Sequence, residues 1–524
     1  MALVLVVFGL GTGGCTTATV VDEESPSADG SANDRGSVVD VTQPEGSAGG
    51  DADASTGPGN DADVVDSTST TTDANTIIDS GGQLIDSVVV KLPDGSDAGF
   101  KVDAADAAPV SPWPDASPAA NGTAFPFPQH RAIPHCVLAN GSRPADIQAA
   151  YSQWKSDTLV DAGSGAYRVQ RLQSDPENPD GCTPHGSTVS EGIGYGMLIA
   201  AYMGDQATFD GLWLFEQQNL DGNGLMNWAP EGVPANPAAP ECGGAATDAD
   251  EDMAFALLLA DKQWGGQGSL TKTYLVYAKQ QITNIWNTEI RDSKLAAAGD
   301  GSWAGWGNVN ISYFAPAYYR AFAKVDTDST HHWTGASPDA GSVVDGGSVL
   351  DTVYDTIDSA LSSSVGNQSN GLVPAWCNEA NNACTATGAA NEPYSYQYDS
   401  CRTPFRIALD WCWNGEPRAQ AYLAKISSFF SGIGAKNIVD GYALDGGPQP
   451  EHPASGGVLP QSAAFVGPAG VGAMGAASTQ SFVDDAYANV ATLSLLVGGT
   501  YYDDSWTVMS LLMMTGNFLD YSEL

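Results

Sequence analysis

The sequence predicts an all-α fold. Residues 121–524 contain segments in which apolar residues recur at helical spacing, separated by stretches rich in Gly, Pro and Asn. Alternation of apolar and polar residues, typical of strands, is scarce there. These observations favour one domain of about a dozen helices. Periodicity does not determine whether the helices close into a barrel.

The predicted helices can be placed in chain order from their apolar spacing and from the Gly and Pro residues between them. They cover residues 147–155, 193–204, 250–264, 270–286, 316–324, 349–364, 404–413, 419–430, 486–496 and 506–514.

The first 15 residues, "MALVLVVFGLGTGGC", form an apolar run that ends in small residues and Cys15. The run is too short to span a bilayer, which takes about 20 residues. It resembles a bacterial secretory segment with a lipoprotein-type cysteine. We therefore expect a secreted or cell-surface protein with a lipid anchor through Cys15; an ordinary cleaved signal is the alternative.

Residues 16–120 are rich in Asp, Ser, Thr, Gly and Ala, as in "GDADASTGPGNDADVVDSTSTTTDA". Such a composition buries too little apolar surface to offset the entropy of ordering. We expect a disordered acidic linker, followed by one folded domain over residues 121–524. One segment, "LIDSVVVKL" at residues 84–92, is compatible with an isolated strand, although a transiently ordered patch is the favoured interpretation.

The charge of the chain argues against nucleic acid as a partner. The formal net charge is −42, from 62 acidic and 20 basic residues, whereas phosphate binding requires clustered cations. A neutral or cationic ligand is more natural. We expect a monomer.

Eight cysteines fit an exported protein. Beyond Cys15 the number is seven, so at least one thiol stays free. "CNEANNAC", residues 377–384, suggests a short disulfide-closed loop, and Cys182 with Cys242 is a plausible second pair. No CxxC spacing of a zinc or redox site is present.

Motifs for several other chemistries are absent. The sequence contains no GxSxG, no HExxH and no GxxxxGK[ST] loop. "NLDGNG", residues 219–224, begins like a calcium loop, but Pro230 occupies the position that requires a bidentate Glu. A turn is the better interpretation. We expect no cofactor and no metal. We therefore expect carboxylate side chains to carry out the chemistry.

The first acidic candidate is Glu191 in "TVSEGIGYGM". Thr188-x-x-Glu191 matches a capping box, in which the glutamate serves only the helix start. Gly192, Gly194 and Gly196 are not needed by a cap, and each costs about 0.8–1 kcal/mol of helix propensity. They suggest close approach of a ligand or a neighbouring backbone, and we expect open space over Glu191.

Two further acidic clusters precede predicted helices. "TDADED" places Asp248 among acids that also complement a helix dipole, so at most one functional member is inferred. In "YSYQYDSCRTPF", Asp399 and Arg402 lie among aromatic residues. A structural ion pair and a functional role are equally supported there.

Taken together, these segments resemble glycoside hydrolase family 8. The resemblance rests on "SEGIGYGM" at residues 190–197, the segment 246–264, "NVNISYFAPAYYRAF", "YDSCRTPFRIALDWCWNG" and "YYDDSWTVMSLLMMTGNF". It covers residues 125–524 with all blocks in order. It implies an (α/α)6 barrel of six inner and six outer helices, and hydrolysis of β-1,4-linked glycans with inversion.

The resemblance also implies roles for individual residues. Glu191 is expected to be the general acid and Asp399 the general base, while Asp248 holds the distorted sugar. Tyr313 and Arg402 are expected to position the water and the base, with Arg402 favouring the charge of Asp399.

Two tryptophans, Trp228 and Trp303, are expected to stack on sugar rings. Inversion requires carboxyl groups about 6.5–9.5 Å apart, because a water enters opposite the leaving group.

The expected substrate is cellulose or mixed-linkage β-glucan, because "TDADED" and the aspartate of "YDSCR" are both present. Xylan-cleaving members typically replace "TDAD" with a "PDGEE"-like sequence. A chitosanase and then a xylanase are the alternatives. From a different class, a non-catalytic glycan-binding surface protein also remains open.

Overall fold

The computed structural model describes a series of ranges that together contain the helical domain. These are residues 87–91, 97–101, 113–114, 122–175, 181–230, 242–292, 295–301, 304, 308–335, 347–363, 365–378, 395–452, 459–496 and 499–521. The chain divides after Ile85, and all described residues belong to the second unit, Asp86–Leu524.

Twelve α-helices are present in the described part of the chain. They are α1 (Pro144–Thr158), α2 (Ser190–Met203), α3 (Gln206–Gln218), α4 (Thr247–Gln263), α5 (Tyr274–Thr288), α6 (Pro316–Val325), α7 (Val349–Ser362), α8 (Thr403–Asn414), α9 (Pro417–Ile433), α10 (Ala463–Ala473), α11 (Gln480–Leu496) and α12 (Tyr501–Met514).

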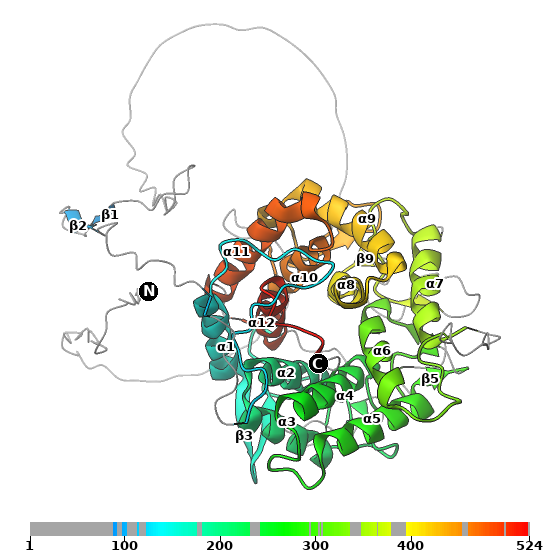
Figure 1. The fold of residues 1–524 in the computed structure, drawn as a ribbon. Helices are drawn as coiled ribbons and strands as arrows, with labels where there is room; N and C mark the ends of the chain where they lie inside the picture. Colours follow the sequence, from blue (N-terminus) through cyan, green and yellow to red (C-terminus); the bar gives the residue numbers. More distant parts are fainter. Residues whose placement is uncertain are drawn as a thin grey trace, which may run out of the picture. The chain divides into compact units, whose positions relative to one another are not determined.

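The even-numbered helices form a closed inner ring. Each packs against the next, from α2 through α4, α6, α8 and α10 to α12, and α12 packs back against α2. Figure 1 shows these six helices around the centre and the odd-numbered helices outside them. The architecture is an (α/α)6 barrel, which confirms the predicted fold class.

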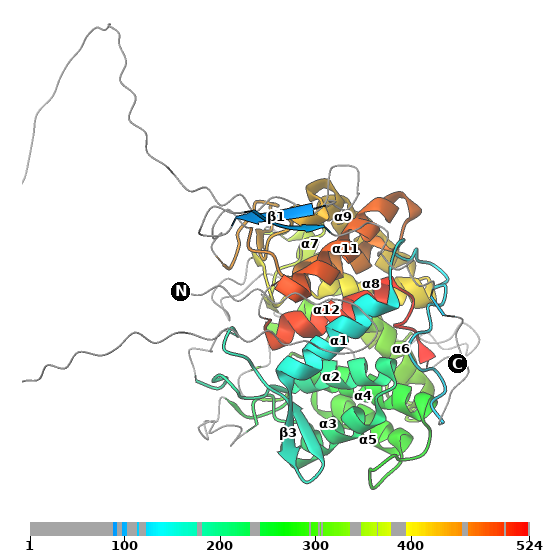
Figure 2. The same cartoon turned by 90° about the vertical axis from the view of Figure 1, so that its left-hand side faces the viewer.

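Each inner helix pairs with an outer neighbour. α3, α5, α7 and α9 pack on the helices that precede them in the chain, and α11 packs on both α10 and α12. α1 closes the outer layer by packing along α11 and α12, as Figure 2 shows. Helical hairpins therefore generate both layers.

The burial of the two layers follows from their sequences. Every residue of α10 is buried, whereas in α7 the buried residues recur at helical spacing along one face. A helix that is apolar all round belongs in an interior, and an amphipathic helix belongs at a surface. No helix in the described ranges is long and apolar enough to cross a membrane.

Within the described ranges, ten short strands form two-stranded antiparallel ladders. They are β1 (Ser87–Lys91) with β2 (Asp97–Lys101), β3 (Leu159–Gly163) with β4 (Ala166–Val169), β5 (Ile290–Arg291) with β6 (Leu295–Ala296), β7 (Asn308–Val309) with β8 (Cys377–Asn378), and β9 (Ser395–Tyr396) with β10 (Tyr442–Ala443). Short 3-10 helices cover Ile311–Tyr313, Ala435–Asn437 and Ala477–Thr479.

All ten predicted helices are present, and two helices were missed. α3 has the sequence "QATFDGLWLFEQQ", and α10 has the sequence "AAFVGPAGVGA" with Pro468 in its interior. α10 was not among the predicted helices, because its Gly and Pro residues disfavour an isolated helix. Burial in the barrel outweighs that propensity.

Part of the predicted linker has a defined backbone or a defined contact. β1 falls in the segment for which the strand was the less favoured interpretation. Trp113 donates from Nε1 to the Ser142 carbonyl at 3.1 Å, and its ring stacks on His130. The ordered contacts of the helical domain therefore begin before residue 121.

The disulfides agree in part with the prediction. Cys182–Cys242 joins the loops before α2 and α4, as predicted, and Cys401 is free and buried. Cys136–Cys412, which ties the segment before α1 to α8, was not foreseen. Cys377 is disulfide-bonded, and its predicted partner Cys384 lies outside the described residues.

Candidate active site

The first turns of three inner helices, with the N-cap of a fourth, meet at one group of side chains. Glu191 lies in the first turn of α2, Asp248 in that of α4 and Tyr501 in that of α12, while Arg402 is the N-cap residue of α8. Arg402 Nη1 contacts both Glu191 Oε1 and Asp248 Oδ2. Glu191 and Asp248 precede Arg402 by 211 and 154 residues in the sequence, and the fold brings both carboxylates to its guanidinium group.

Glu191 accepts three hydrogen bonds. Tyr195 donates its hydroxyl to Oε1 at 2.7 Å, and Tyr501 donates to Oε2 at 2.7 Å. Arg402 Nη1 adds a charged donor to Oε1. The side chain is 17% exposed, so the carboxyl group is held in one orientation and still reaches solvent.

The three glycines after Glu191 allow neighbouring elements to pack closely. A Cβ on Gly194 would lie 3.1 Å from the Ala249 carbonyl oxygen of α4, and one on Gly192 would lie 3.3 Å from the Tyr501 ring. A Cβ on Gly196 would lie 2.9 Å from Leu212. The expectation of a close backbone approach is confirmed at Gly194. The missing side chains of the three glycines face protein, so the close approach that they permit is that of neighbouring elements and not of a ligand.

The capping box predicted at Thr188 and Glu191 does not form. α2 begins at Ser190 with Val189 as its N-cap and has no side-chain cap. The Thr188 hydroxyl instead donates to the Val169 carbonyl of β4 at 2.9 Å. The Glu191 side chain therefore does not cap α2. The side chains that orient it come from α2, from the N-cap of α8 and from α12.

Asp248 is buried beside Arg402. Its side chain is 2% exposed, Oδ2 lies 2.6 Å from Arg402 Nη1, and Oδ1 accepts from the Ala249 amide at 2.9 Å. Burial raises the pKa of Asp248 to about 7; Arg402 opposes the rise, and the Glu191 charge adds to it. Because Asp248 shares Arg402 with Glu191, it retains its proton more readily than an aspartate that was paired with an arginine alone.

Asp399 is the most exposed of the three carboxylates, at 37% of its side chain. Oδ2 accepts from Trp376 Nε1 at 3.0 Å and from Gln397 Nε2 at 3.3 Å. Its backbone amide donates to Gln397 Oε1 at 2.7 Å, and its carbonyl accepts from the Ser312 hydroxyl at 2.6 Å. The base expected from the sequence is thus fixed through both its backbone and its side chain.

Arg402 serves a larger set of carboxylates than the one predicted. Its Nη2 lies 3.9 Å from Asp399 Oδ1, whereas Nη1 contacts Glu191 and lies 2.6 Å from Asp248. Arg402 thus lies beside Asp399, as expected, and its closer contacts to Glu191 and Asp248 were not foreseen. The guanidinium group separates Glu191 from Asp399.

The predicted aromatic residues have different surroundings. The Tyr313 ring lies under the Arg402 guanidinium, 4.8 Å from centroid to Cζ. Trp228 packs beside the Cys182–Cys242 disulfide, and its carbonyl accepts from the Ser190 amide at 2.9 Å, next to Glu191. Trp303 lies outside the described residues.

Several residues of the site escaped the sequence analysis: Tyr195, Tyr501, Trp376, Gln397 and Ser312. Trp376 and Tyr501 come from loops or helix starts with no periodic signal. Tyr195 follows Glu191 by four residues, which places both on one helix face. That spacing was one available signal, and Gln397, Ser312 and Tyr501 also lie inside segments that the sequence analysis quoted.

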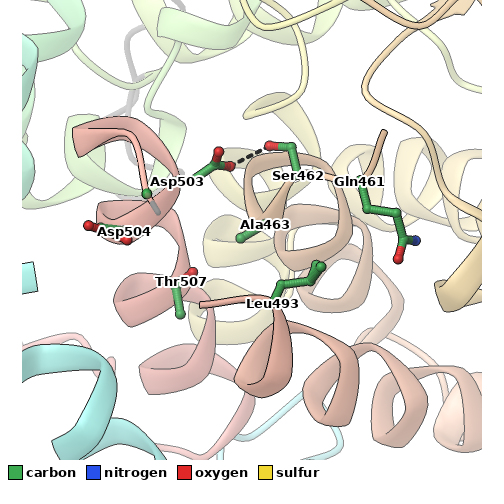
Figure 3. A pocket seen from close by; sticks show the side chains of 8 residues that line it. Gln461, Ser462, Ala463, Leu493, Asp503, Asp504 and Thr507 are labelled. Carbon is green, nitrogen blue, oxygen red and sulfur yellow. Dashed lines mark hydrogen bonds between the residues drawn. The ribbon is translucent and has the colours of Figure 1, made fainter. Parts of the chain in front are cut away.

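A pocket lined by described residues lies between the first turns of α10 and α12 (Figure 3). Gln461, Ser462, Asp503, Asp504 and Thr507 line it, and Ser462 donates to Asp503 at 2.5 Å. Asp503 also approaches the Ala464 amide. This contact ties the two helix starts together, and none of Glu191, Asp248 and Asp399 lines the pocket.

No group of three or more metal-ligating side chains that could hold an ion occurs among the described residues. In "NLDGNG", Asp221 Oδ1 accepts from the amides of Asn223 and Leu225. The loop is therefore a turn, as interpreted from the sequence.

Glycoside hydrolases use a pair of carboxyl groups that flank the scissile bond. The site has such a pair, with a guanidinium group between the two carboxyl groups. Comparison with known proteins gives the particular class. The model of "Glycosyl hydrolases family 8" matches residues 125–516. The chain belongs to this family, as the sequence motifs predicted.

The relatives include enzymes and a solved structure. Endoglucanase A of Acetivibrio thermocellus is 33% identical over 71% of this chain and 70% of its own length. The beta-glucanase of Niallia circulans is 32% identical over 76% of this chain and 91% of its own. The apo structure of a beta-1,3-1,4-glucanase from Paenibacillus sp. X4 superposes with a TM-score of 0.62 at 30% identity, covering 75% of this chain and 98% of that one.

Proposed function

We propose that this protein is an inverting endo-acting glycosidase that cleaves internal β-1,4 linkages of cellulose or mixed-linkage β-glucan. The observation that carries the proposal is the placement of Glu191 and Asp399 on different nitrogens of one guanidinium group. Inversion needs carboxyl groups about 6.5–9.5 Å apart, and direct contact would leave no space for the attacking water.

Glu191 acts as the general acid in this proposal. It has to carry a proton that it delivers to the glycosidic oxygen as the C–O bond breaks. Asp248 contacts the same Arg402 nitrogen as Glu191, and burial raises the pKa of Asp248 to about 7, so a proton is available close to Glu191 near neutral pH. The side chain retains access to solvent on one side.

Asp399 acts as the general base. It removes a proton from the water that attacks the anomeric carbon from the opposite face of the sugar. Its side chain is exposed to solvent, and the two N–H donors on Oδ2 fix the plane of the carboxylate. Tyr313 and Arg402, which lie against each other, position this water.

Asp248 and the tryptophans complete the proposed subsite at the cleavage point. Asp248 holds the distorted sugar once substrate displaces part of its contact with Arg402, and Trp228 and Trp303 stack on sugar rings. A β-1,4-linked polysaccharide or oligosaccharide is the partner in this proposal.

The choice of substrate rests on the relatives, which carry the names endoglucanase and beta-glucanase. A reducing-sugar assay on carboxymethylcellulose, lichenan, chitosan and xylan tests it. We expect release from lichenan or carboxymethylcellulose to exceed release from the other two. A preference for chitosan or xylan contradicts the substrate, and no release from any polymer favours a non-catalytic glycan-binding protein.

We also propose export to an oxidising compartment and a monomeric state. Two disulfides are described, and Cys377 takes part in a third. Exposed large apolar side chains in the described ranges are scattered single residues. Light scattering tests the monomer. Labelling with a lipid precursor tests the predicted anchor at Cys15, and its absence there favours a cleaved signal.

A further inference from the structure

We infer that Trp376 is a positioning residue for the base, whose indole N–H fixes Asp399 so that Oδ1 is the oxygen that takes the proton from water. This inference rests on the proposed function, because it takes Asp399 as the base. It concerns a residue that the sequence analysis did not single out.

The two oxygens of Asp399 have unequal surroundings. Oδ2 accepts from two N–H groups, Trp376 Nε1 at 3.0 Å and Gln397 Nε2 at 3.3 Å. Arg402 Nη2 lies 3.9 Å from Oδ1, beyond hydrogen-bond distance. Oδ2 is thus engaged as an acceptor, and Oδ1 keeps its lone pairs for a water.

The backbone holds Trp376 firmly at this point. The preceding residue, Ala375, donates its amide to the Ser395 carbonyl of β9 at 3.1 Å. The following residue, Cys377, is disulfide-bonded and pairs with Val309 in the β7–β8 ladder. The ring packs edge-on against Tyr313, with centroids 6.0 Å apart. An anchored tryptophan costs little further entropy when it donates.

The chemical consequence follows from the charge of the acceptor. A hydrogen bond to a carboxylate favours its ionised form and fixes its plane. General-base catalysis requires both an ionised group and an oxygen aimed at the water. Loss of the indole N–H is therefore expected to lower turnover while leaving glycan binding largely unchanged.

The alternative role for Trp376 is that of a sugar platform. A ring that stacks on substrate contributes to binding through its face, and a phenylalanine retains much of that contact. A platform therefore affects KM more than kcat and leaves the pH profile in place. The two roles differ in measurable quantities.

The test compares Trp376→Phe with the matched change Trp413→Phe. Trp413 lies near the far end of α8, and its Nε1 has no hydrogen-bond partner among the described residues. We expect Trp376→Phe to lower kcat roughly 10- to 100-fold, the range for a hydrogen bond to a charged group. We also expect it to leave KM within about twofold and to move the acid limb of the kcat profile up by about one pH unit. Trp413→Phe is expected to keep the wild-type limb.

A companion variant, Asp399→Asn, separates the inference from the proposed function. If Asp399→Asn retains turnover, the base is misassigned and both fail. If Asp399→Asn is inactive while Trp376→Phe keeps the wild-type kcat and acid limb, the inference alone is overturned, as it is if only KM changes. Should Trp376→Phe fail to fold, Gln397→Met removes the other donor to Oδ2 and is expected to move kcat and the limb in the same direction. Unchanged values there overturn the inference.

Discussion

Arg402 connects the acidic residues of the site. Its guanidinium is 2% exposed, donates through Nη1 to Glu191 and Asp248, and donates through Nε to Ser312 at 3.0 Å. A planar fork with several N–H groups can serve all these acceptors at once, whereas a lysine ammonium cannot. The relative positions of Glu191, Asp248 and Asp399 thus depend on one buried cation.

The two proposed catalytic carboxyl groups give the first prediction. Glu191→Gln and Asp399→Asn are each expected to lower kcat by roughly 10²- to 10⁴-fold, the usual contribution of a general acid or base. Both amides keep the size of the side chain, so oligosaccharide binding measured by calorimetry is expected to remain. Near-normal turnover in either variant contradicts the role of that residue.

The sequence predicted this group of residues better than it predicted the contacts among them. Motif order identified Glu191, Asp248, Asp399 and Arg402, and one guanidinium brings them together. It did not indicate that Arg402 would favour Glu191 over Asp399. Distances across a barrel depend on helix packing, and a local pattern near Asp399 carries no information on it.

At the scale of elements, α4 and α8 are linked by two parallel ion pairs. Asp248 and Asp252 lie one turn apart on α4, and Arg402 and Arg406 lie one turn apart at the start of α8. Arg406 Nη2 donates to Asp252 Oδ2 at 2.7 Å. α6 stands between α4 and α8 in the inner ring, so the arginines reach across the barrel interior and fix the relative positions of two helix starts.

Close packing of α2 on α4 gives the second prediction. Gly194→Ala is expected to destabilise the protein by about 1–2 kcal/mol, even though alanine favours helix. The reason is that the new Cβ would lie 3.0 Å from Asp252 Cβ and 3.1 Å from the Ala249 carbonyl oxygen. Urea unfolding followed by circular dichroism measures the difference.

The matched control is Gly432→Ala in α9, where a Cβ would have no neighbour within 4 Å. There alanine is expected to stabilise by up to about 1 kcal/mol. Equal stability of the two variants would show that α2 and α4 can move apart freely, contrary to the packing described above.

The whole molecule buries many carboxyl groups with few cations to pair them. Burial raises the pKa of Glu216 to about 8, that of Asp504 to about 8 and that of Asp175 to about 6. Above about pH 4 the unfolded chain loses these protons, whereas the folded chain keeps that of Asp175 up to about pH 6 and those of Glu216 and Asp504 up to about pH 8. Stability therefore falls as pH rises through this window.

The third prediction follows from this fall in stability with rising pH. The melting temperature is expected to be higher at pH 5 than at pH 8, and Glu216→Gln is expected to reduce that difference, because glutamine has no proton to lose. Calorimetry at both pH values measures the effect.

Glu416→Gln serves as the control. Hydrogen bonds and charges from Arg418 and Arg320 hold the pKa of Glu416 below its ordinary value despite partial burial. Glu416 is therefore ionised in both states from pH 5 to 8, and its replacement should leave the pH difference unchanged. A melting temperature that rises from pH 5 to 8 in the wild type would contradict the account.

The architecture as a whole was predictable because helical spacing repeats over the chain and the motifs follow the family order. The boundary of the folded domain and the helical state of α10 were not predictable. α10 contains Pro468 and three glycines, and only the surrounding barrel makes it a helix. Trp113, which hydrogen-bonds to Ser142, lies in a segment with the acidic composition of a linker. No periodic pattern in that segment predicts the contact.

The central claim, that Glu191 and Asp399 act on opposite faces of the glycosidic bond, is tested most directly by the stereochemistry of the product. Proton NMR during hydrolysis of a cello-oligosaccharide or lichenan reports the anomer released before mutarotation. The account predicts that the α-anomer accumulates first and that the β-anomer follows as the two equilibrate. Initial release of the β-anomer would contradict it.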